Sequence, residues 1–241
     1  MQLYDMHSHI LPDFDDGAQT VEDSLKLIDC LKKQGISHIC LTPHYYTNEK
    51  SVEDFIDSRR EAFEKFRPHI PEDVEMVLGA EVYVTQYLLN SNDLSGLTYG
   101  KSNYILTEYS YSSSFNDRTM FFFDRLVRNY GLIPVLPHVE RYGYLMDHPD
   151  VMCELQDMGV IIQTNISNYT VKAPFFRKRK LLKYIAKGWI DILGSDAHSF
   201  THNTPEFFSQ AMNTITEKCG ADTLARMMQT AEMIFQSAVG D

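Results

Sequence analysis

The stretch Met6-His7-Ser8-His9-Ile10 (MHSHI, residues 6–10) places two histidines two positions apart, directly after the short apolar run that opens the chain. Side chains alternate from face to face along a β-strand, so His7 and His9 lie on one face if this segment is extended. Two imidazoles on one face can bind one metal ion together. A single HxH pair is weak evidence, because histidines at this spacing also occur by chance. The rest of the chain must therefore decide.

Short apolar runs of strand length recur along the chain and are rich in Ile, Val, Leu or aromatic residues. They are Leu3–Met6, His38–Leu41, Glu75–Leu78, Tyr104–Leu106, Ile133–Leu136, Val160–Gln163 and Ile190–Leu193. Amphipathic stretches separate most of them. Seven strands that alternate with helices predict an α/β fold with a parallel sheet, either a closed barrel or an open doubly wound sheet.

Capping signals mark the expected helices. Thr20 with Asp23 and Ser51 with Asp54 have the spacing of N-terminal capping boxes, and a glycine follows most of the helical patterns. The expected helices are Val21–Gln34, one from Ser51, Asp117–Tyr130, Pro149–Met158, Phe175–Lys187, one beginning at Pro205, and Asp222–Gln236. No repeat or linker interrupts this order, so residues 1–241 are expected to form one domain.

The side chains suited to metal binding fall at, or just after, the C-terminal ends of these strands. An open sheet gathers ligands at one switch point between a few strands, whereas residues from six of seven strands converge only if the strands close into a ring. The sequence therefore predicts a barrel with a metal site at its C-terminal mouth. Asp15 and Asp16 both follow the first strand, and the nine expected ligands are His7, His9, Asp16, His44, Glu81, Glu108, His138, Asp196 and His198.

Nine donors exceed what one ion needs and fit two or three divalent ions. Imidazole and carboxylate without thiolate suit Mn²⁺, Fe²⁺ or Zn²⁺. Such a centre can supply a metal-bound hydroxide as nucleophile and a positive field for a phosphate dianion, which predicts phosphoester hydrolysis. Arg141, three residues after His138, is a candidate phosphate clamp; the alternative is a surface salt bridge with a neighbour such as Glu140.

Composition narrows the classes of partner. The net charge of −11 argues against a general surface for nucleic acid or anionic membrane, which would need clustered Lys and Arg. No signal sequence or apolar run long enough to span a membrane is present, so we expect a cytoplasmic protein without membrane insertion. The run Arg177-Lys178-Arg179-Lys180 is interpreted as a solvated helix face, with an acidic or phosphorylated partner tail as the alternative ligand.

At the candidate ligands the sequence resembles the PHP family of metal-dependent phosphoesterases, named for its polymerase and histidinol phosphatase members. The resemblance covers nearly the whole chain, through DMHSHILPDFDDGAQT, LTPHYY, LGAEVYVT, YILTEYS, IPVLPHVERY, the QTN strand and ILGSDAH. It implies a distorted (β/α)7 TIM-like barrel that holds three ions, often manganese. By position, the resemblance assigns His7, His9, Glu81 and Asp196 to the first ion, Glu81, Glu108 and His138 to the second, and Asp16, His44 and His198 to the third.

The DDG and HxERY elements resemble most the bacterial protein tyrosine phosphatases of capsule and exopolysaccharide gene clusters. That branch implies removal of phosphate from the tyrosine-rich tail of a cognate tyrosine kinase, with Arg141 binding phosphate. Relatives of this branch often carry a further arginine shortly after the DxH motif. This chain has Ser199-Phe200-Thr201-His202-Asn203 there, which leaves His202 as a weak substitute.

The sequence also bears on other classes of protein. A cysteine-based phosphatase needs Cys and Arg six positions apart, and none of Cys30, Cys40, Cys153 and Cys219 has that spacing. Amidohydrolase barrels imply a lysine and a histidine where Glu108 and Asn165 stand. A small-molecule phosphatase of the histidinol phosphatase type and a non-catalytic metal-binding scaffold stay open. Aromatic residues in the strand-end loops favour a phosphotyrosine ring; they are Tyr45, Tyr46, Tyr109, Tyr111, Phe115, Tyr142 and Tyr144.

Overall fold

The computed structural model describes residues 2–240, in which nine strand segments pair only in parallel. The segments are β1 (Tyr4–Ser8), β2 (His38–Leu41), β3 (His44–Tyr46), β4 (Glu75–Leu78), β5 (Glu81–Tyr83), β6 (Tyr104–Glu108), β7 (Ile133–Leu136), β8 (Ile161–Asn165) and β9 (Ile192–Gly194). All seven predicted runs overlap a strand, so the parallel α/β architecture is confirmed; β1, β6, β8 and β9 extend past the C-terminal ends of their predicted runs. The two additional segments, β3 and β5, arise because two strands are interrupted and then continue.

Two strands are broken in the middle, at Thr42-Pro43 between β2 and β3 and at Gly79-Ala80 between β4 and β5. Pro43 has no backbone N–H and cannot donate to a ladder. The two broken strands stay paired across the gaps, because the Gly79 N–H donates to Leu41 O at 2.8 Å and the Glu81 N–H to Pro43 O at 3.0 Å. β3 and β5 therefore begin with His44 and Glu81 directly opposite each other.

The strand order closes into a ring. One sheet has the order β1-β2-β4 and the other β3-β5-β6-β7-β8-β9, and the broken strands join them. The two ends meet at a parallel bridge between Ser8 and Ala197. Two backbone hydrogen bonds flank this bridge, from Asp196 N–H to His7 O at 2.7 Å and from His9 N–H to Ala197 O at 2.9 Å. The predicted distorted seven-stranded barrel thus closes through one bridge and not through a full ladder.

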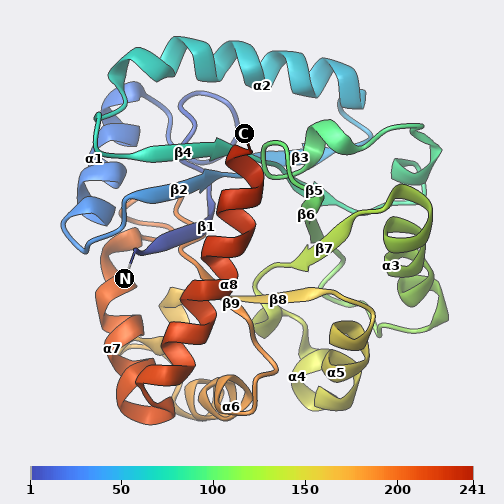
Figure 1. Cartoon of the computed structure of the whole chain (residues 1–241), viewed down its shortest axis with the longest axis vertical. Coiled ribbons are helices and arrows are strands. Elements are labelled where there is room, and N and C mark those ends of the chain that lie inside the picture. The colour runs from blue at the N-terminus through green and yellow to red at the C-terminus, as the bar shows by residue number, and fades with distance from the viewer. Residues whose placement is uncertain (1, 241) are drawn as a thin grey trace.

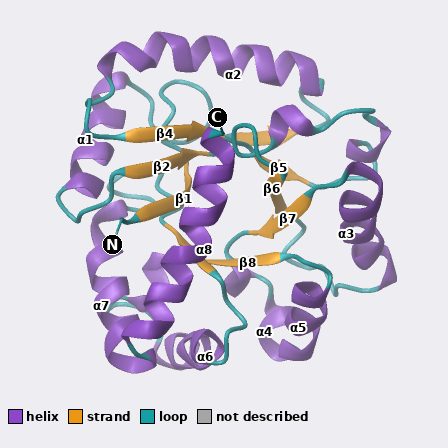
Figure 2. Ribbon diagram, viewed as in Figure 1, coloured by secondary structure: helices purple, strands orange, loops and turns teal. Residues whose placement is uncertain are grey.

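Helices surround the strands on the outside (Figure 2). They are α1 (Val21–Lys32), α2 (Val52–Phe66), α3 (Asp117–Tyr130), α4 (Gly143–Asp147), α5 (Pro149–Asp157), α6 (Phe175–Ala186), α7 (Phe208–Cys219) and α8 (Ala221–Val239). The predicted caps are present, since the side chains of Thr20 and Ser51 accept hydrogen bonds from the N–H groups of Asp23 and Asp54, each at 3.1 Å.

Two differences from the predicted helices go beyond shifts of one to three residues at the helix ends. The short helix α4 was not predicted, because five residues carry too little periodicity to be recognised. The helix expected to begin at Pro205 starts with a separate 3₁₀ turn, Pro205–Phe207, and the α-helix begins only at Phe208. Pro205 still occupies the first position of a helical turn, where its missing N–H costs nothing.

The last helix closes one end of the barrel. In Figure 1, α8 crosses in front of the strands, and it contacts β1, β4 and β9. Its Ile234 and Phe235 pack with Tyr4, Met6 and other apolar side chains of the barrel interior in one buried cluster. A second, larger cluster lies mainly between the strands and the outer helices. The metal-binding candidates follow the C-terminal ends of the strands, so they lie at the end of the barrel that α8 does not cover.

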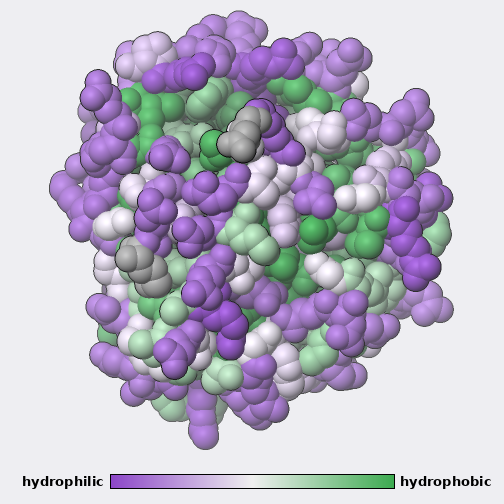
Figure 3. Space-filling view, viewed as in Figure 1, coloured by the Kyte–Doolittle hydropathy of each residue, from purple (hydrophilic) through white to green (hydrophobic). Residues whose placement is uncertain are grey.

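The surface seen from the α8 side is mostly hydrophilic, with hydrophobic side chains showing mainly in the furrows between helices (Figure 3). Within residues 2–240, no helix is long and apolar enough to cross a membrane. All four cysteines are free thiols, which agrees with their scattered positions in the sequence.

Candidate metal centre

The two histidines of MHSHI converge as strand geometry predicts. Both rings are fully buried, and their Nε2 atoms lie 3.1 Å apart. Each Nε2 lies 3.3 Å from Glu81 Oε2 and 3.5 Å from Asp196 Oδ1. Four donors, from β1 and the residue after its end, from β5 and from the segment after β9, thus surround one point. Two imidazole nitrogens facing each other at this distance, with two carboxylates beside them, fit a shared divalent cation.

A second set of donors extends from Glu81 toward β6 and β7. His138 Nε2 lies 2.7 Å from Glu81 Oε1 and 3.6 Å from Glu108 Oε1. His44 Nδ1 lies 3.0 Å from the other oxygen, Glu81 Oε2. His138 adopts a left-handed backbone conformation with φ of 36°, where the chain turns sharply after β7. The Glu81 carboxylate therefore stands between two groups of donors, as a bridging ligand would.

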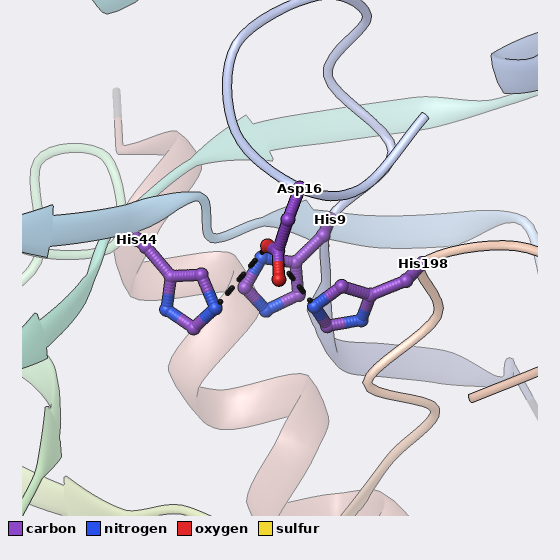
Figure 4. A group of neighbouring side chains, drawn as sticks. All are labelled: His9, Asp16, His44 and His198. Carbon is purple, nitrogen blue, oxygen red and sulfur yellow. Dashed lines mark ion pairs between the residues drawn. The ribbon is translucent and has the colours of Figure 1, made fainter. Parts of the chain in front are cut away.

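A third set lies nearer the solvent and is drawn in Figure 4. His44 Nε2 and His198 Nε2 each lie 3.5 Å from Asp16 Oδ1, so the carboxylate sits between the two imidazoles. The ring of His9 stacks on that of His198 with centroids 4.0 Å apart, which connects this set to the first. Four overlapping groups of potential ligands form in residues 2–240, and together they contain all nine predicted ligands and no other residue.

The buried charges of the cluster influence one another strongly. Burial alone would raise the pKa of Glu81, but the histidines His7, His138 and His44 outweigh it and hold this pKa well below its ordinary value. Burial likewise opposes protonation of His7, and the carboxylates of Glu81 and Asp196 outweigh it, so the pKa of His7 is raised. The buried carboxylates thus favour positive charge inside the cluster, which either protonated histidines or bound metal cations can provide.

The DDG motif folds back over the histidine pair. Asp15 Oδ2 lies 2.7 Å from His9 Nδ1 and accepts the N–H of His44 at 3.0 Å. Asp15 accepts the Nδ1 proton, which leaves Nε2 of His9 free to face the donor cluster. Gly17 allows the turn, because a Cβ at this position would collide with the carbonyl oxygen of His9. Asp15 was not predicted to act separately from Asp16, and only its place in the motif could have suggested it.

Two polar residues of the buried strand β8 also support the cluster, and neither was predicted. Gln163 Oε1 accepts the N–H of His138 at 2.8 Å, and its amide nitrogen donates to Asn165 Oδ1 at 2.9 Å. Asn165 Nδ2 in turn donates to Asp196 Oδ2 at 2.8 Å. The run of polar residues at the C-terminal end of β8, all of them buried, is the signal that could have revealed them.

Arg141 faces the cluster and not its sequence neighbour. Its Nη2 donates to Asp196 Oδ2 at 2.5 Å, and its Nη1 donates to the hydroxyl of Tyr111 at 3.0 Å. Glu140 points elsewhere and accepts the hydroxyl of Thr164 at 2.9 Å. The alternative of a salt bridge between Arg141 and Glu140 is therefore not what the structure has. Arg141 lines a cavity of about 470 Å³ over the cluster.

The segment that lacks a second arginine also reaches this cavity. His202 lines the cavity, and its ring lies 5.2 Å from that of His198. Asn203 Nδ2 donates to Asp196 Oδ2 at 2.9 Å, from a left-handed backbone position with φ of 46°. Arg141, Asn165 and Asn203 thus all donate to the same carboxylate oxygen. Among residues 197–240, none brings a second guanidinium to this cavity.

The prediction about aromatic residues was wrong for several of them. Tyr45, Phe115 and Tyr142 are buried packing residues that do not line the cavity over the cluster. Tyr144 packs on His148 with ring centroids 4.4 Å apart and is absent from the cavity lining. Tyr46, Tyr111 and the largely buried Tyr109 do line the cavity, together with Tyr83, which was not predicted. Sequence alone places these aromatic residues in loops but does not say which of them face solvent.

A parallel α/β barrel with imidazole and carboxylate donors gathered at its mouth defines a class, the metal-hydrolase barrels. The chain matches the family described as capsular polysaccharide synthesis, CpsB/CapC, over residues 3–236, and it belongs to that family. It is 30% identical to the tyrosine-protein phosphatase CpsB of Streptococcus pneumoniae, over 91% of this chain and 92% of that protein. It is 27% identical to the tyrosine-protein phosphatase YwqE of Bacillus subtilis, over 98% and 92%.

Solved structures agree with the fold. The chain superposes with a TM-score of 0.79 on one of the crystal structures of YwqE from Bacillus subtilis and CpsB from Streptococcus pneumoniae. Both of those proteins are metal-dependent tyrosine phosphatases. This chain and the matched one are 23% identical, and the match covers 98% of this chain and 95% of that one. A phosphotriesterase homology protein from Escherichia coli with phosphate in its active site matches with a TM-score of 0.58 at 11% identity, over 98% of each chain. The expected PHP-type barrel is therefore the fold observed.

Proposed function

We propose that this chain is a metal-dependent protein tyrosine phosphatase that hydrolyses phosphotyrosine on a protein of capsule or exopolysaccharide synthesis. The observation that carries the proposal is the convergence of nine potential metal ligands in one cluster, beneath a cavity that Arg141 and five of these ligands line. Membership of the CpsB/CapC family supports the link to capsular polysaccharide synthesis. The names of the relatives support phosphotyrosine as the bond that is cleaved.

Three divalent ions are proposed for the centre, with manganese favoured and iron or zinc as alternatives. His7, His9, Glu81 and Asp196 would hold the first ion, and Glu81, Glu108 and His138 the second. Asp16, His44 and His198 would hold the third. The overlapping groups support this division, since Glu81 contributes one oxygen toward His7 and His9 and the other toward His138. Ions bound there supply the Lewis acidity that phosphoester hydrolysis requires.

The chain's own residues orient the substrate. Arg141 presents a planar guanidinium that can bind two phosphoryl oxygens, and its contacts with Asp196 and Tyr111 fix its direction. Burial, the largest cause, raises the pKa of Tyr111, so this hydroxyl stays protonated and donates to Glu108. Tyr46, Tyr83 and Tyr111 offer aromatic surface to a phenyl ring. A phenolate leaving group of pKa about 10 demands less assistance from a general acid than an alkoxide does.

The proposed phosphoprotein is the cognate tyrosine kinase of the same polysaccharide system. The resemblance of DDG and HxERY to the tyrosine phosphatase branch supports this partner, and the family description supports the link to capsule. A kinase tail with several tyrosines would present flexible, solvent-exposed phosphotyrosines to the cavity. A cytoplasmic location is part of this proposal.

Steady-state kinetics test the proposal. With Mn²⁺ added, kcat/KM is measured for a phosphotyrosyl peptide, the matched phosphoseryl peptide and histidinol phosphate. The phosphotyrosyl peptide is expected to be the best substrate by at least about tenfold, which corresponds to about 1.4 kcal/mol in the transition state. Histidinol phosphate as the best substrate would replace the proposal with a small-molecule phosphatase. Failure to hydrolyse any aryl phosphate would support a metal-binding scaffold.

Two variants assign the activity to the cluster. His138→Ala and Asp196→Ala are expected to lose nearly all turnover while circular dichroism stays that of a folded barrel. His69→Ala is the matched control, because His69 is exposed and lies outside every ligand group. Turnover near that of the wild type in either cluster variant would contradict the assignment.

A further inference from the structure

The start of α6 exposes apolar side chains to an unusual degree. Val171 is 81% exposed, Phe175 65% and Phe176 82%. The two phenylalanine rings meet each other edge to face, with centroids 5.5 Å apart. Large apolar side chains that protrude together in this way mark an interaction surface more often than isolated exposed residues do. We call this region the α6 tip, defined as Val171, Lys172, Phe175, Phe176, Arg177 and Arg179.

The α6 tip is also strongly basic. Residues 172–187 contain seven Lys and Arg and no Asp or Glu, in a chain whose net charge is −11. Lys180 pairs with Asp147 at 2.9 Å, and Lys178 donates to Thr170 O at 2.9 Å. Lys172, Arg177, Arg179 and Lys183 are exposed and form no ion pair within residues 2–240. Their charge is therefore available to an external anion.

The α6 tip lies at the same end of the barrel as the candidate metal centre. β8 ends at Asn165, whose side chain donates to the proposed ligand Asp196. The segment from Asn165 to Phe175 leaves the C-terminal end of this strand and leads into α6. In a β/α barrel such loops and the helix N-termini they enter lie at the mouth. Figure 1 looks nearly along α6, at the edge of the molecule.

The shape of the α6 tip separates two kinds of acidic ligand. A peptide is held in a groove that contacts its backbone and side chains. The tip residues line neither the cavity over the metal centre nor four further surface cavities. Protruding Phe and Val side chains with cations beside them suit the interface of a bilayer, where aromatic rings enter the headgroup region and Lys and Arg meet lipid phosphates.

We propose that the α6 tip binds the surface of an anionic lipid membrane, with the mouth of the barrel turned toward that surface. Phe175, Phe176 and Val171 enter the headgroup region, and Lys172, Arg177 and Arg179 contact the anionic lipids. The overall charge of −11 predicted no affinity for such a membrane, but the charge is unevenly distributed and reverses at this tip. Binding is peripheral and independent of the proposed hydrolysis.

Cosedimentation with vesicles tests this. The full chain is expected to pellet with vesicles of equimolar phosphatidylglycerol and phosphatidylcholine, and not with phosphatidylcholine alone. Phe175→Ser with Phe176→Ser is expected to lower the affinity at least about tenfold, because two rings no longer leave water. Arg177→Glu with Arg179→Glu is expected to abolish the dependence on phosphatidylglycerol. All variants should hydrolyse p-nitrophenyl phosphate as the wild type does.

Matched controls come from other helices. Phe121→Ser removes an exposed aromatic ring from α3, and Arg60→Glu with Arg67→Glu reverses charges at α2 and just after it. Vesicle binding by these controls should equal that of the wild type. Pelleting of the tip variants at wild-type levels, or no pelleting of the wild type, would overturn the proposal. A raised KM for a phosphotyrosyl peptide in tip variants that still bind vesicles would identify a peptide contact instead and overturn it as well.

Discussion

Asp15 contributes no atom to the donor cluster, yet it determines which nitrogen of His9 faces that cluster. The hydrogen bond and charge of His9 outweigh the effect of burial and hold the pKa of Asp15 well below its ordinary value. Asp15→Ala is expected to weaken manganese binding about 10- to 100-fold, as measured by isothermal titration calorimetry. Asp13→Asn, an exposed acid in the same loop, serves as control. Wild-type affinity in Asp15→Ala would contradict the role.

Arg141 offers a second prediction on single residues. Arg141→Lys keeps the positive charge but loses the planar fork, so kcat/KM for an aryl phosphate is expected to fall about 100-fold. Manganese content should be measured in parallel, because Arg141 also contacts the proposed ligand Asp196. Arg60→Lys on the surface of α2 is the control. A change of less than about twofold in the Arg141 variant would argue against a phosphate clamp.

The candidate ligands could be predicted from sequence because each stands in a short motif at the end of an apolar run. His7 and His9 share a strand face by simple alternation, and the structure has them there. Gln163 and Asn165 could not be predicted, since their partners His138 and Asp196 come near only when the ring forms. The exposure of loop tyrosines likewise depends on packing that no local pattern encodes.

Helix α8 covers one end of the barrel and packs into its interior. Phe235 is fully buried and its ring contacts those of Tyr4 and His38, with centroids 5.5 and 5.1 Å away. Phe235→Ala is expected to lower the free energy of unfolding by about 3–5 kcal/mol, measured by urea denaturation. Met233→Ala on the same helix, at a side chain 51% exposed, should change it by less than about 0.5 kcal/mol. Equal effects of the two substitutions would contradict the role of α8 in covering the barrel end.

Asp191 ties β8 to the start of β9, since its Oδ2 accepts the Ile162 N–H at 2.8 Å. Burial raises the pKa of this carboxyl in the folded chain. The folded state therefore keeps the proton to higher pH than the unfolded state, and stability falls as pH rises from about 4 through the raised pKa. In urea unfolding of the metal-free chain, the free energy of unfolding of Asp191→Asn should rise relative to that of the wild type as the pH increases over this range. A difference that does not change with pH would contradict this.

Elements were predictable where their pattern is long enough. The apolar runs and the amphipathic helices α1, α2 and α3 appear as expected. The continuation of two strands beyond their breaks could not be predicted, because β3 and β5 begin with polar residues, His44 and Glu81, that face the site. That the C-terminal helix is part of the core was predictable from its Met-rich pattern. That it covers the end of the barrel follows only from the three-dimensional arrangement.

The whole molecule should be more stable with metal bound. Several histidines and carboxylates are buried together in the centre, and a ligand that binds only the folded state stabilises it. Manganese at a hundredfold excess over its Kd is expected to raise the free energy of unfolding by about 2.7 kcal/mol per independent site. Chelation should reverse the gain. His69→Ala should respond as the wild type does, whereas equal stabilisation of His138→Ala would contradict the assignment.

The bridge between Ser8 and Ala197 also has a consequence for biosynthesis. Ser195 and His7, joined by a hydrogen bond at the same place, lie 188 positions apart in the chain. During translation β1 emerges first and keeps one edge unpaired until the segment after β9 leaves the ribosome. His7 and His9, at and just after the end of β1, lack Asp196 and His198 through the same interval. A chain released before residue 196 would carry an open strand edge and an incomplete ligand set, so the last segments complete the barrel and the candidate site in the same event.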